Sequence, residues 1–564
     1  MGDITVIKDA GNNRGLSDDQ AAAMLGEGDL ILTACPGSGK TRSIAARMAM
    51  LVSEGEALAL VSYTNTGADE IARAAAELHG TRIDGLNFVG TLHSFIHKYL
   101  IQPFAHLLTG SVVPVRIDPD AVSELSPIGD RVHNYRYTVD GVLVPKGAKT
   151  PSAPADILAA QTSKELAASR GVVGYDDALH YSYRILQEFP NIARALAIRF
   201  GEIIVDEAQD SNEAQLAILS AIKLAGLKSL VLVGDYDQTI YSFGGSRPDL
   251  CQRLATELGL RPWELRENFR SSQILCNTTA RFRQNKAPDL AVGKYAFDQT
   301  QPRILLYDPG SPEELPESFS RLLSEAGQPS SSVILVRSKA LRARISGRPD
   351  IELWNEIEIL IDAKMSESAP SLRKWRSLET MLLRCSLGGA DGAAGCISRG
   401  DLRRYSVELV QMLPDLGGSI GDWAVQVLEV VDSVAEALHP ENARKLARGR
   451  TIPQGWYRVE LQKYLLGSSP WDVETIHSSK GTTVEAVMIV ANEPSKPWMT
   501  SDAANWSRPL MSGSNSGASG PGSEELRIFY VGVTRAERSL VVALPNSTPS
   551  NLVSSFVHAG FSGL

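Results

Sequence analysis

The stretch 33-TACPGSGKTR-42 constrains the fold of this chain more than any other segment. It follows the apolar run 30-LILTA-34, which has the length of a strand, and a region with helical periodicity comes after it. A glycine-rich turn between a strand and a helix is typical of phosphate-binding loops with the pattern G-x-x-x-x-G-K-[ST]. Ala34 replaces the first glycine, while the spacing and the Gly-Lys-Thr end are intact. The segment therefore predicts a P-loop within an α/β fold.

The chemistry of such a loop assigns a role to several of its residues. Gly37 and Gly39 allow backbone N–H groups to converge on phosphate oxygens. Lys40 supplies a positive charge at the β- and γ-phosphates, and Thr41 supplies a hydroxyl group for Mg²⁺. The loop residues that we expect to contact the nucleotide are Ala34, Cys35, Pro36, Gly37, Ser38, Gly39, Lys40, Thr41 and Arg42.

Other apolar runs of strand length predict two parallel sheets. The runs 57–64, 202–206 and 229–235 end in small or acidic residues and precede helical patterns, so they join 30–34 in one sheet. A second set of runs comprises 302–308, 332–338, 473–477, 486–491 and 539–544. Each set is interrupted by a long insert, and the first insert contains a predicted hairpin centred on Asp140-Gly141.

Two carboxylates follow the predicted strand 202–206 in the segment 203-IIVDEAQD-210. Asp206 is suited to hold Mg²⁺, and Glu207 is suited to orient or deprotonate the attacking water. A solvated turn is the competing interpretation, but a position at the end of a buried strand, downstream of a P-loop, favours a site. Gln238 follows the strand 229–235, where its amide can sense a γ-phosphate.

Further candidates lie beyond this point in the chain. Arg270 and Arg535 are far from the loop in sequence, which suits γ-phosphate contacts made from a second domain, although a single arginine is usually surface charge. Tyr241 and Phe243 also follow the strand 229–235, and core packing is the competing interpretation for these rings.

The segments that carry these residues, in their order along the chain, resemble those of the superfamily 1A helicases of the UvrD/PcrA/Rep type. The resemblance covers most of the chain and implies two RecA-like domains with an ATP cleft between them, each carrying a mainly helical insert. It implies a first RecA-like domain at 1–95 and 190–262 with an insert at 96–189, and a second at 263–348 and 469–564 with a reduced insert at 349–468. It also implies ATP hydrolysis with Mg²⁺ and 3′-to-5′ movement along single-stranded or partly duplex DNA.

The resemblance assigns the nucleotide-binding and catalytic residues. Gln20, in 16-LSDDQ-20, matches a glutamine that reads adenine, and an amide that both donates and accepts favours ATP over GTP. Phe269 replaces a tyrosine that stacks on adenine. The residues that match the catalytic positions are Lys40, Asp206, Glu207, Gln238, Arg270 and Arg535, and the Mg²⁺ ligands are Thr41 and Asp206.

The resemblance also assigns a set of DNA contacts. Tyr63 takes the place of an aromatic that stacks on a base, which is a contact that tolerates any sequence. Thr91 and His93 match positions near the DNA backbone, and His477 matches a residue that links the DNA and ATP sites. The full predicted set is Tyr63, Thr64, Asn65, Thr91, His93, Tyr241, Phe243 and His477.

Two departures from the family pattern bear on function. Gly244 replaces an arginine that contacts DNA, and Thr483 replaces a glutamate that contacts ribose. We therefore expect a DNA-stimulated ATPase more strongly than a processive helicase, with a role in repair, recombination or anti-phage defence. The alternative hypothesis is an ATPase subunit that senses nucleotide or DNA ends and regulates a partner nuclease, as in compact anti-phage systems such as Gabija. Self-association of this chain is a further hypothesis about its partners.

Composition sets limits on partners and compartment. The net charge of −9 and the pI of about 5.6 mean that DNA contacts must lie in a local groove. Five cysteines without paired spacing, together with a polar start to the chain, predict the reducing cytoplasm. The longest apolar runs have strand length, so no membrane partner is expected.

Overall fold

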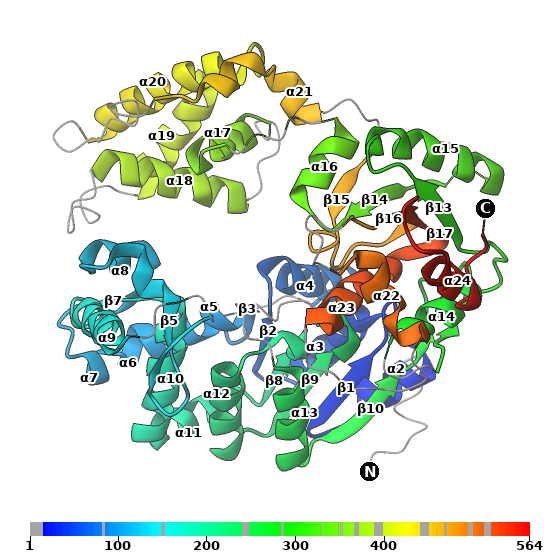
Figure 1. Cartoon of the computed structure of the whole chain (residues 1–564). Helices are drawn as coiled ribbons and strands as arrows, with labels where there is room; N and C mark the ends of the chain where they lie inside the picture. Colours follow the sequence, from blue (N-terminus) through cyan, green and yellow to red (C-terminus); the bar gives the residue numbers. More distant parts are fainter. Residues whose placement is uncertain are drawn as a thin grey trace.

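The computed structural model describes most of the chain. The described residues are 15–81, 85–147, 150, 153–239, 247–283, 287–327, 329–347, 349, 351, 353–365, 372–387, 399–439, 451–466, 471–493, 500–511 and 521–563. Two parallel sheets form its centre, and two inserts extend from them, coloured cyan and yellow in Figure 1. The α/β class with two parallel sheets is therefore confirmed.

The first sheet has six parallel strands in the order β10-β1-β9-β8-β2-β3. These are β1 (Leu30–Ala34), β2 (Leu58–Ser62), β3 (Phe88–Thr91), β8 (Glu202–Val205), β9 (Ser229–Gly234) and β10 (Arg261–Leu265). The four strands predicted from apolar runs are the four inner strands, and they are buried on both faces except at two positions of β1. Near-continuous apolar runs are what such doubly covered strands require.

The two strands that the apolar runs did not indicate are the edges of this sheet. β10 has the sequence RPWEL with alternating exposure, and β3 has the sequence FVGT with one buried residue. An edge strand needs less apolar sequence because it pairs on one side only. β10 extends the first sheet to Leu265, past the expected domain limit at residue 262. The domain limits themselves stay predictions.

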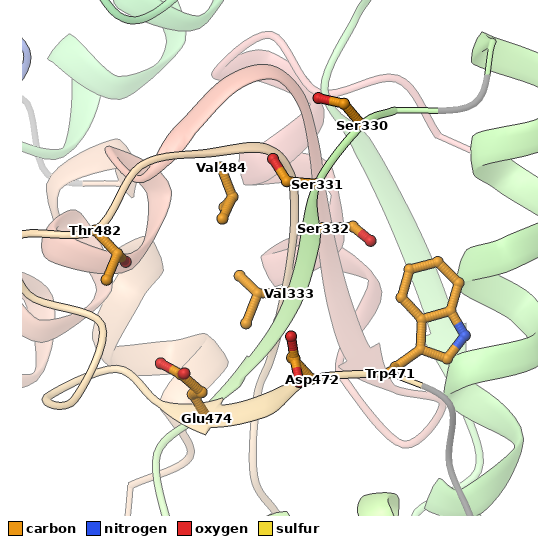
Figure 2. A pocket seen from close by; sticks show the side chains of 9 residues that line it. All are labelled: Ser330, Ser331, Ser332, Val333, Trp471, Asp472, Glu474, Thr482 and Val484. Carbon is orange, nitrogen blue, oxygen red and sulfur yellow. The ribbon is translucent and has the colours of Figure 1, made fainter. Parts of the chain in front are cut away.

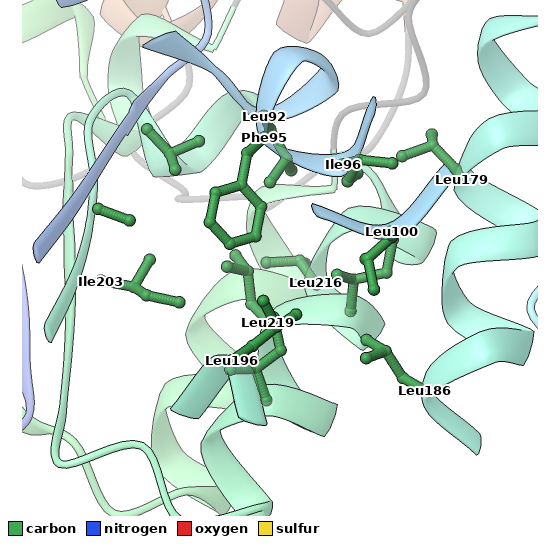
Figure 3. Packing of buried hydrophobic residues seen from close by; sticks show 14 of the residues in the cluster. Leu92, Phe95, Ile96, Leu100, Leu179, Leu186, Leu196, Ile203, Leu216 and Leu219 are labelled. Atoms are coloured by element: carbon green, nitrogen blue, oxygen red, sulfur yellow. The ribbon is translucent and has the colours of Figure 1, made fainter. Parts of the chain in front are cut away.

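The first insert shares a core with the first sheet. Its chain leaves β3 through α5 (Leu92–Ile96) and a π-helical turn (His97–Ile101), and it returns through α10 (Tyr175–Glu188) and α11 (Pro190–Arg199). Figure 3 shows Phe95 and Leu100 packing among apolar residues of α10, β8 and α12 (Glu213–Leu224). The remaining helices of this insert are α6 (Gln102–Phe104), α7 (His106–Thr109), α8 (Pro119–Leu125) and α9 (Pro154–Ser169). The continuous core means that the insert is not an independent lobe.

The hairpin predicted in this insert is present. β5 (Tyr135–Tyr137) pairs antiparallel with β6 (Leu143–Pro145), and Gly141 has a φ of +83° in the turn. The ring of His180 on α10 stacks on Tyr137 with centroids 4.2 Å apart and an interplanar angle of 18°. The histidine is thereby buried against the hairpin.

We expect His180 to make the protein sensitive to acid. Burial, aided by the charge of Arg184, lowers the pKa of His180 to about 4, whereas an unfolded histidine titrates near 6.5. The unfolded state therefore binds the proton first, so stability is full above about pH 6.5 and falls as the pH approaches 4. We predict that His180→Phe, which retains the stack, removes about 2 kcal/mol of the stability difference between about pH 7.5 and pH 5. Urea unfolding of both proteins at the two pH values measures this, and an unchanged difference would contradict it.

The second sheet has five parallel strands in the order β13-β17-β16-β14-β15. These are β13 (Arg303–Tyr307), β14 (Ser332–Val336), β15 (Val473–Thr475), β16 (Val484–Val490) and β17 (Ala536–Pro545), and all five match predicted runs. The helices that flank them are α14 (Gln273–Thr279), α15 (Leu315–Ala326), α16 (Lys339–Ser346), α22 (Asp502–Met511), α23 (Pro521–Val533) and α24 (Ser550–His558).

The second insert connects α16 to β15 and has its own apolar core around Trp423. Its helices are α17 (Asn355–Met365), α18 (Leu372–Leu387), α19 (Arg399–Met412), α20 (Ile420–Leu438) and α21 (Leu461–Leu466), which Figure 1 shows as a body set apart from both sheets. The expectation of a helix-rich insert in this region agrees with these elements. Within the described ranges, no helix combines the length and apolarity needed to cross a bilayer.

Candidate functional site

The P-loop lies where the sequence placed it, between β1 and α3 (Lys40–Ser53). Gly37 and Gly39 have φ values of +75° and +76°, which disfavour residues with a Cβ. Space excludes a side chain at Gly37 as well, because a Cβ there would lie 2.5 Å from the Cβ of Arg270 and 2.8 Å from Oδ1 of Asn268. Ala34 is the last residue of β1 and has no positive φ, so this position does not require the usual glycine.

The loop delivers the N-terminus of α3 to the expected phosphate position. The first helical hydrogen bond runs from Ser43 N to Gly39 O at 2.9 Å, so the earlier N–H groups have no acceptor within the helix. Such groups, together with the helix dipole, attract phosphate oxygens. Lys40 is half-buried at the first helical position, and Thr41 and Arg42 are exposed beside it.

Two residues predicted to hold adenine lie next to the loop. Gln20 belongs to the capping box that begins α2 (Asp18–Met24), where its Oε1 accepts from Ser17 N at 2.9 Å. Its Nε2 donates to Ser38 O at 2.7 Å, so one amide hydrogen and one lone pair are left for a base. Phe269 is 41% exposed, and its backbone N–H donates to Gly37 O at 2.9 Å, which places its main chain beside the loop.

The two carboxylates follow β8 and differ in their surroundings. Asp206 is buried, and Ser62 Oγ donates to its Oδ2 at 3.2 Å. Burial, followed by the charge of Glu207, raises the pKa of Asp206. Burial also opposes the charge of Glu207, but Lys480 and Lys40 outweigh it and lower the pKa of this carboxyl. Glu207 therefore keeps a carboxylate that can accept a proton or orient a water.

Glu207 also has an unusual backbone. Its φ is +52°, and among the described residues no other non-glycine has a positive φ. A left-handed conformation costs such a residue free energy, and it persists where surrounding contacts fix it, often at functional sites. The conformation turns the chain into the 3₁₀ turn Ala208–Asp210 directly after the strand.

The second sheet supplies charged groups to this part of the first domain. Arg535 is buried, and its Nη2 donates to Gln238 Oε1 at 2.7 Å. Gln238 in turn donates from Nε2 to Asp235 Oδ2 at 2.5 Å. Lys480 Nζ lies 2.6 Å from Asp210 Oδ2 and 3.6 Å from Glu207 Oε2. The cleft is therefore closed by groups of both sheets.

The two predicted arginines lie close enough to influence one another. Arg270 Nη1 donates to Thr534 O at 2.7 Å, next to Arg535. Burial, followed by the charge of Arg535, lowers the pKa of Arg270 to about 9, and burial lowers the pKa of Arg535 to about 10. A buried guanidinium next to a half-buried one favours binding of an anion such as a γ-phosphate, which relieves their repulsion.

The donors around Asp206 fit Mg²⁺. This ion prefers oxygen ligands and is held by one or two carboxylates together with phosphates. The Asp206 carboxylate and the exposed Thr41 hydroxyl would hold it, and when bound it neutralises charge on the phosphates. Among the described residues, no cluster of three or more histidine, cysteine or acidic side chains forms a protein-only metal site.

Four of the predicted DNA contacts, Tyr63, Thr64, Asn65 and Thr91, lie at one end of the first sheet. β2 and β3 end side by side, with Ser62 in register with Thr91. Tyr63 and Thr64 follow β2, and Thr64 caps α4 (Asn65–His79). Tyr63 is 37% exposed, so it can offer a ring to a base.

Two other DNA candidates lie on α5 and after β15. His93 lies on α5 with its ring edge-on to Tyr175 at 5.4 Å, and burial lowers its pKa. His477 follows β15 and is half-buried, and burial, aided by Arg337, lowers its pKa. Tyr241 and Phe243 lie outside the described residues.

A separate cavity of about 400 Å³ lies at the start of β14 and β16 in the second sheet. Figure 2 shows the side chains that line it, among them Ser330 to Ser332 at the start of β14 and Trp471 and Glu474 from the segment that forms β15. None of the residues predicted for ATP, Mg²⁺ or DNA lines this cavity. It is therefore distinct from the cleft.

Sequence reasoning did not assign Gln209, Asp235 or Lys480 to the site. Asp235 directly follows β9, and Gln209 lies in the 3₁₀ turn four residues after β8, so their placement beyond the carboxyl ends of two neighbouring strands was a usable signal. Lys480 comes three positions after His477, within a recognised block, but nothing in its sequence indicated a partner in the first domain.

The fold and the cleft define a P-loop ATPase built from two RecA-like domains. The N-terminal domain model of the UvrD/REP helicases matches residues 16–129 and 143–258. The chain is 24% identical to the ATP-dependent DNA helicase UvrD2 of Mycobacterium tuberculosis (strain ATCC 25618 / H37Rv), over 94% of this chain and 78% of that protein. It is 27% identical to DNA helicase II of Escherichia coli (strain K12), over 48% and 40%.

A third relative matches a shorter region. It is one of the subunits of an ATP-dependent helicase/nuclease from Natranaerobius thermophilus (strain ATCC BAA-1301 / DSM 18059 / JW/NM-WN-LF), and it is 38% identical over 20% of this chain and 9% of that protein. By these matches the chain is similar to the UvrD-type superfamily 1 helicases.

Proposed function

We propose that this protein is an ATP-dependent DNA translocase that moves 3′-to-5′ on single-stranded DNA, and that DNA stimulates its ATP hydrolysis. The observation that carries the proposal is the cross-domain contact of Arg535 with Gln238. A γ-phosphate bound between these groups would hold the two sheets together, and its loss would release them. A nucleotide-dependent closure of this kind can drive stepping along a strand that stacks on Tyr63 without reading sequence.

The test measures steady-state ATP hydrolysis with and without single-stranded DNA. We expect the DNA to raise kcat at least about tenfold, and we expect Lys40→Ala to abolish turnover, because it removes the positive charge at the β- and γ-phosphates. Oligonucleotides labelled at either end then report direction, with faster arrival expected at the 5′ end. Arrival at the 3′ end would overturn the direction, and hydrolysis that ignores DNA would overturn the coupling.

The second candidate is an ATPase subunit that regulates a partner nuclease. It is favoured by the match to a helicase/nuclease subunit, which covers only 20% of this chain. Purification with the products of neighbouring genes separates this candidate from a motor that acts alone in repair, recombination or anti-phage defence. A stable complex whose nuclease activity changes with ATP would support it, and strand separation by the isolated chain would favour the motor.

A further inference from the structure

Gln209 is a fully buried side chain between the two strands that carry the hydrolysis residues. Its relative exposure is 0%. Nε2 donates to Oε2 of Glu207, and Oε1 accepts from the backbone N–H of Asp235 at 3.1 Å. The amide therefore bridges the end of β8 and the end of β9. Because a buried amide pays a desolvation cost unless it is bonded, both contacts stabilise this one placement.

The orientation of the amide is determined by its neighbours. A carboxylate only accepts hydrogen bonds, and a backbone N–H only donates. Rotating the amide by half a turn would set its oxygen against Glu207 and its NH₂ against the Asp235 N–H, so both bonds would be replaced by repulsion. The side chain can therefore present only a donor to Glu207.

The chain leaves space for this amide at Gly234. A Cβ on Gly234 would lie 2.2 Å from Gln209 Oε1 and 3.3 Å from Gln209 N. Gly234 is not among the glycines with positive φ, so its backbone conformation does not by itself demand glycine. The space is required because Gln209 occupies it. The glycine at this position therefore agrees with the placement that the hydrogen bonds give to the amide.

The bridge completes a path from the second domain to the Glu207 carboxylate. Arg535 donates to Gln238 at 2.7 Å, and Gln238 donates to Asp235 at 2.5 Å. Asp235 N then donates to Gln209, which donates to Glu207. Arg535, Gln238, Asp235 and Gln209 are buried and Glu207 is half-buried, so these hydrogen bonds and the Asp235 main chain form a continuous connection from Arg535 to Glu207.

We propose that Gln209 is a positioning residue that holds the Glu207 carboxylate toward the attacking water and couples its orientation to Arg535. The inference rests on the proposed ATPase function and adds to it a residue that acts through Glu207. Glu207 needs such support because its left-handed backbone is not a conformation that it favours by itself. Substrate binding does not depend on Gln209, so its loss affects the chemical step and leaves ATP affinity in place.

The test compares Gln209→Met with a matched control, Gln215→Met. Methionine keeps the length of the buried side chain and removes both hydrogen bonds. Gln215 is also buried, but its amide caps α12 and accepts from Asn212 N at 2.9 Å. We expect Gln209→Met to lower the DNA-stimulated kcat about 10- to 100-fold with the KM for ATP within about twofold. Gln215→Met should leave both constants within about twofold.

A double variant separates positioning from general damage. If Gln209 acts through Glu207, Gln209→Met adds less than about a further twofold to the kcat loss of Glu207→Gln. If the two losses of kcat multiply in the double variant, the inference is overturned. It is also overturned if Gln209→Met raises the KM for ATP while kcat stays native. Should Gln209→Met not fold, Gln209→Glu keeps the side-chain shape, places a like charge against Glu207 and is expected to show the same loss of kcat. Native kcat in Gln209→Glu would likewise overturn it.

Measuring the native chain in the same assay separates failure of the proposed ATPase function from failure of the positioning role of Gln209. An inactive native chain would overturn the proposed function and this inference with it. An active native chain whose kcat is insensitive to Gln209→Met would overturn the positioning role alone.

Discussion

Replacing Arg535 with alanine is expected to lower the DNA-stimulated kcat for ATP by about 10³-fold or more, which is the scale of an arginine that stabilises charge in phosphoryl transfer. The guanidinium is buried and contacts Gln238, so its charge acts in a site that excludes water. Arg535→Lys should not restore activity, because an ammonium group cannot reproduce the planar fork that donates from several nitrogens. Stopped-flow phosphate release with saturating DNA measures the loss.

The matched control for this prediction is Arg538→Ala. Arg538 lies three residues after Arg535, on β17, but it is paired with Asp298 at 2.8 Å and with Glu485 at 3.5 Å and is partly exposed. These partners hold Arg538 away from Gln238, so kcat should stay within about twofold of the native value. If Arg535→Ala retained more than about a tenth of native kcat, the assignment of this residue to the γ-phosphate would be wrong.

The sequence allowed correct placement of site residues that lie close together along the chain. The P-loop and the carboxylates after β8 are short segments in which spacing alone brings the groups together, and the inner strands are read from their apolar runs. Lys40, Asp206 and Glu207 could therefore be placed at one edge of a sheet without coordinates. Their assigned roles remain predictions.

The cross-cleft contacts could not be predicted in the same way. Arg535 and Gln238 are 297 positions apart, and Lys480 and Asp210 are 270 apart, so only the packing of two domains decides whether they meet. The resemblance to a family placed Arg535 at the cleft, but it gave no partner for Lys480. The two edge strands of the first sheet, β3 and β10, were missed because neither has a continuous apolar run.

Gln20 illustrates a third limit. The resemblance assigned it to adenine, whereas its amide also closes the capping box of α2 and bonds Ser38 in the loop. One side chain thus fixes the relation between a helix start and the P-loop. A pattern of residue types cannot separate these roles, because both require an amide at the same position.

Replacing Glu207 with glutamine is the second change with a large expected effect. The carboxylate is the group suited to accept a proton from the attacking water, and loss of a general base costs about 10²- to 10⁴-fold. We therefore predict a kcat about 10³-fold below native, with the protein folded, because the amide keeps the side-chain shape. ATP affinity should be equal or higher, since one negative charge near the phosphates is removed.

The measurement for Glu207→Gln is single-turnover hydrolysis together with equilibrium binding of a fluorescent ATP analogue. The control is Glu213→Gln, an exposed glutamate in the first turn of α12, which should behave as the native protein. Loss of ATP binding in Glu207→Gln would contradict a role confined to hydrolysis and would indicate that the Lys480 contact with this carboxylate maintains the cleft. If Glu207→Gln binds ATP but does not hydrolyse it, the protein stays in its ATP-bound state. Its affinity for DNA with and without ATP then measures how much closure of the cleft strengthens DNA binding.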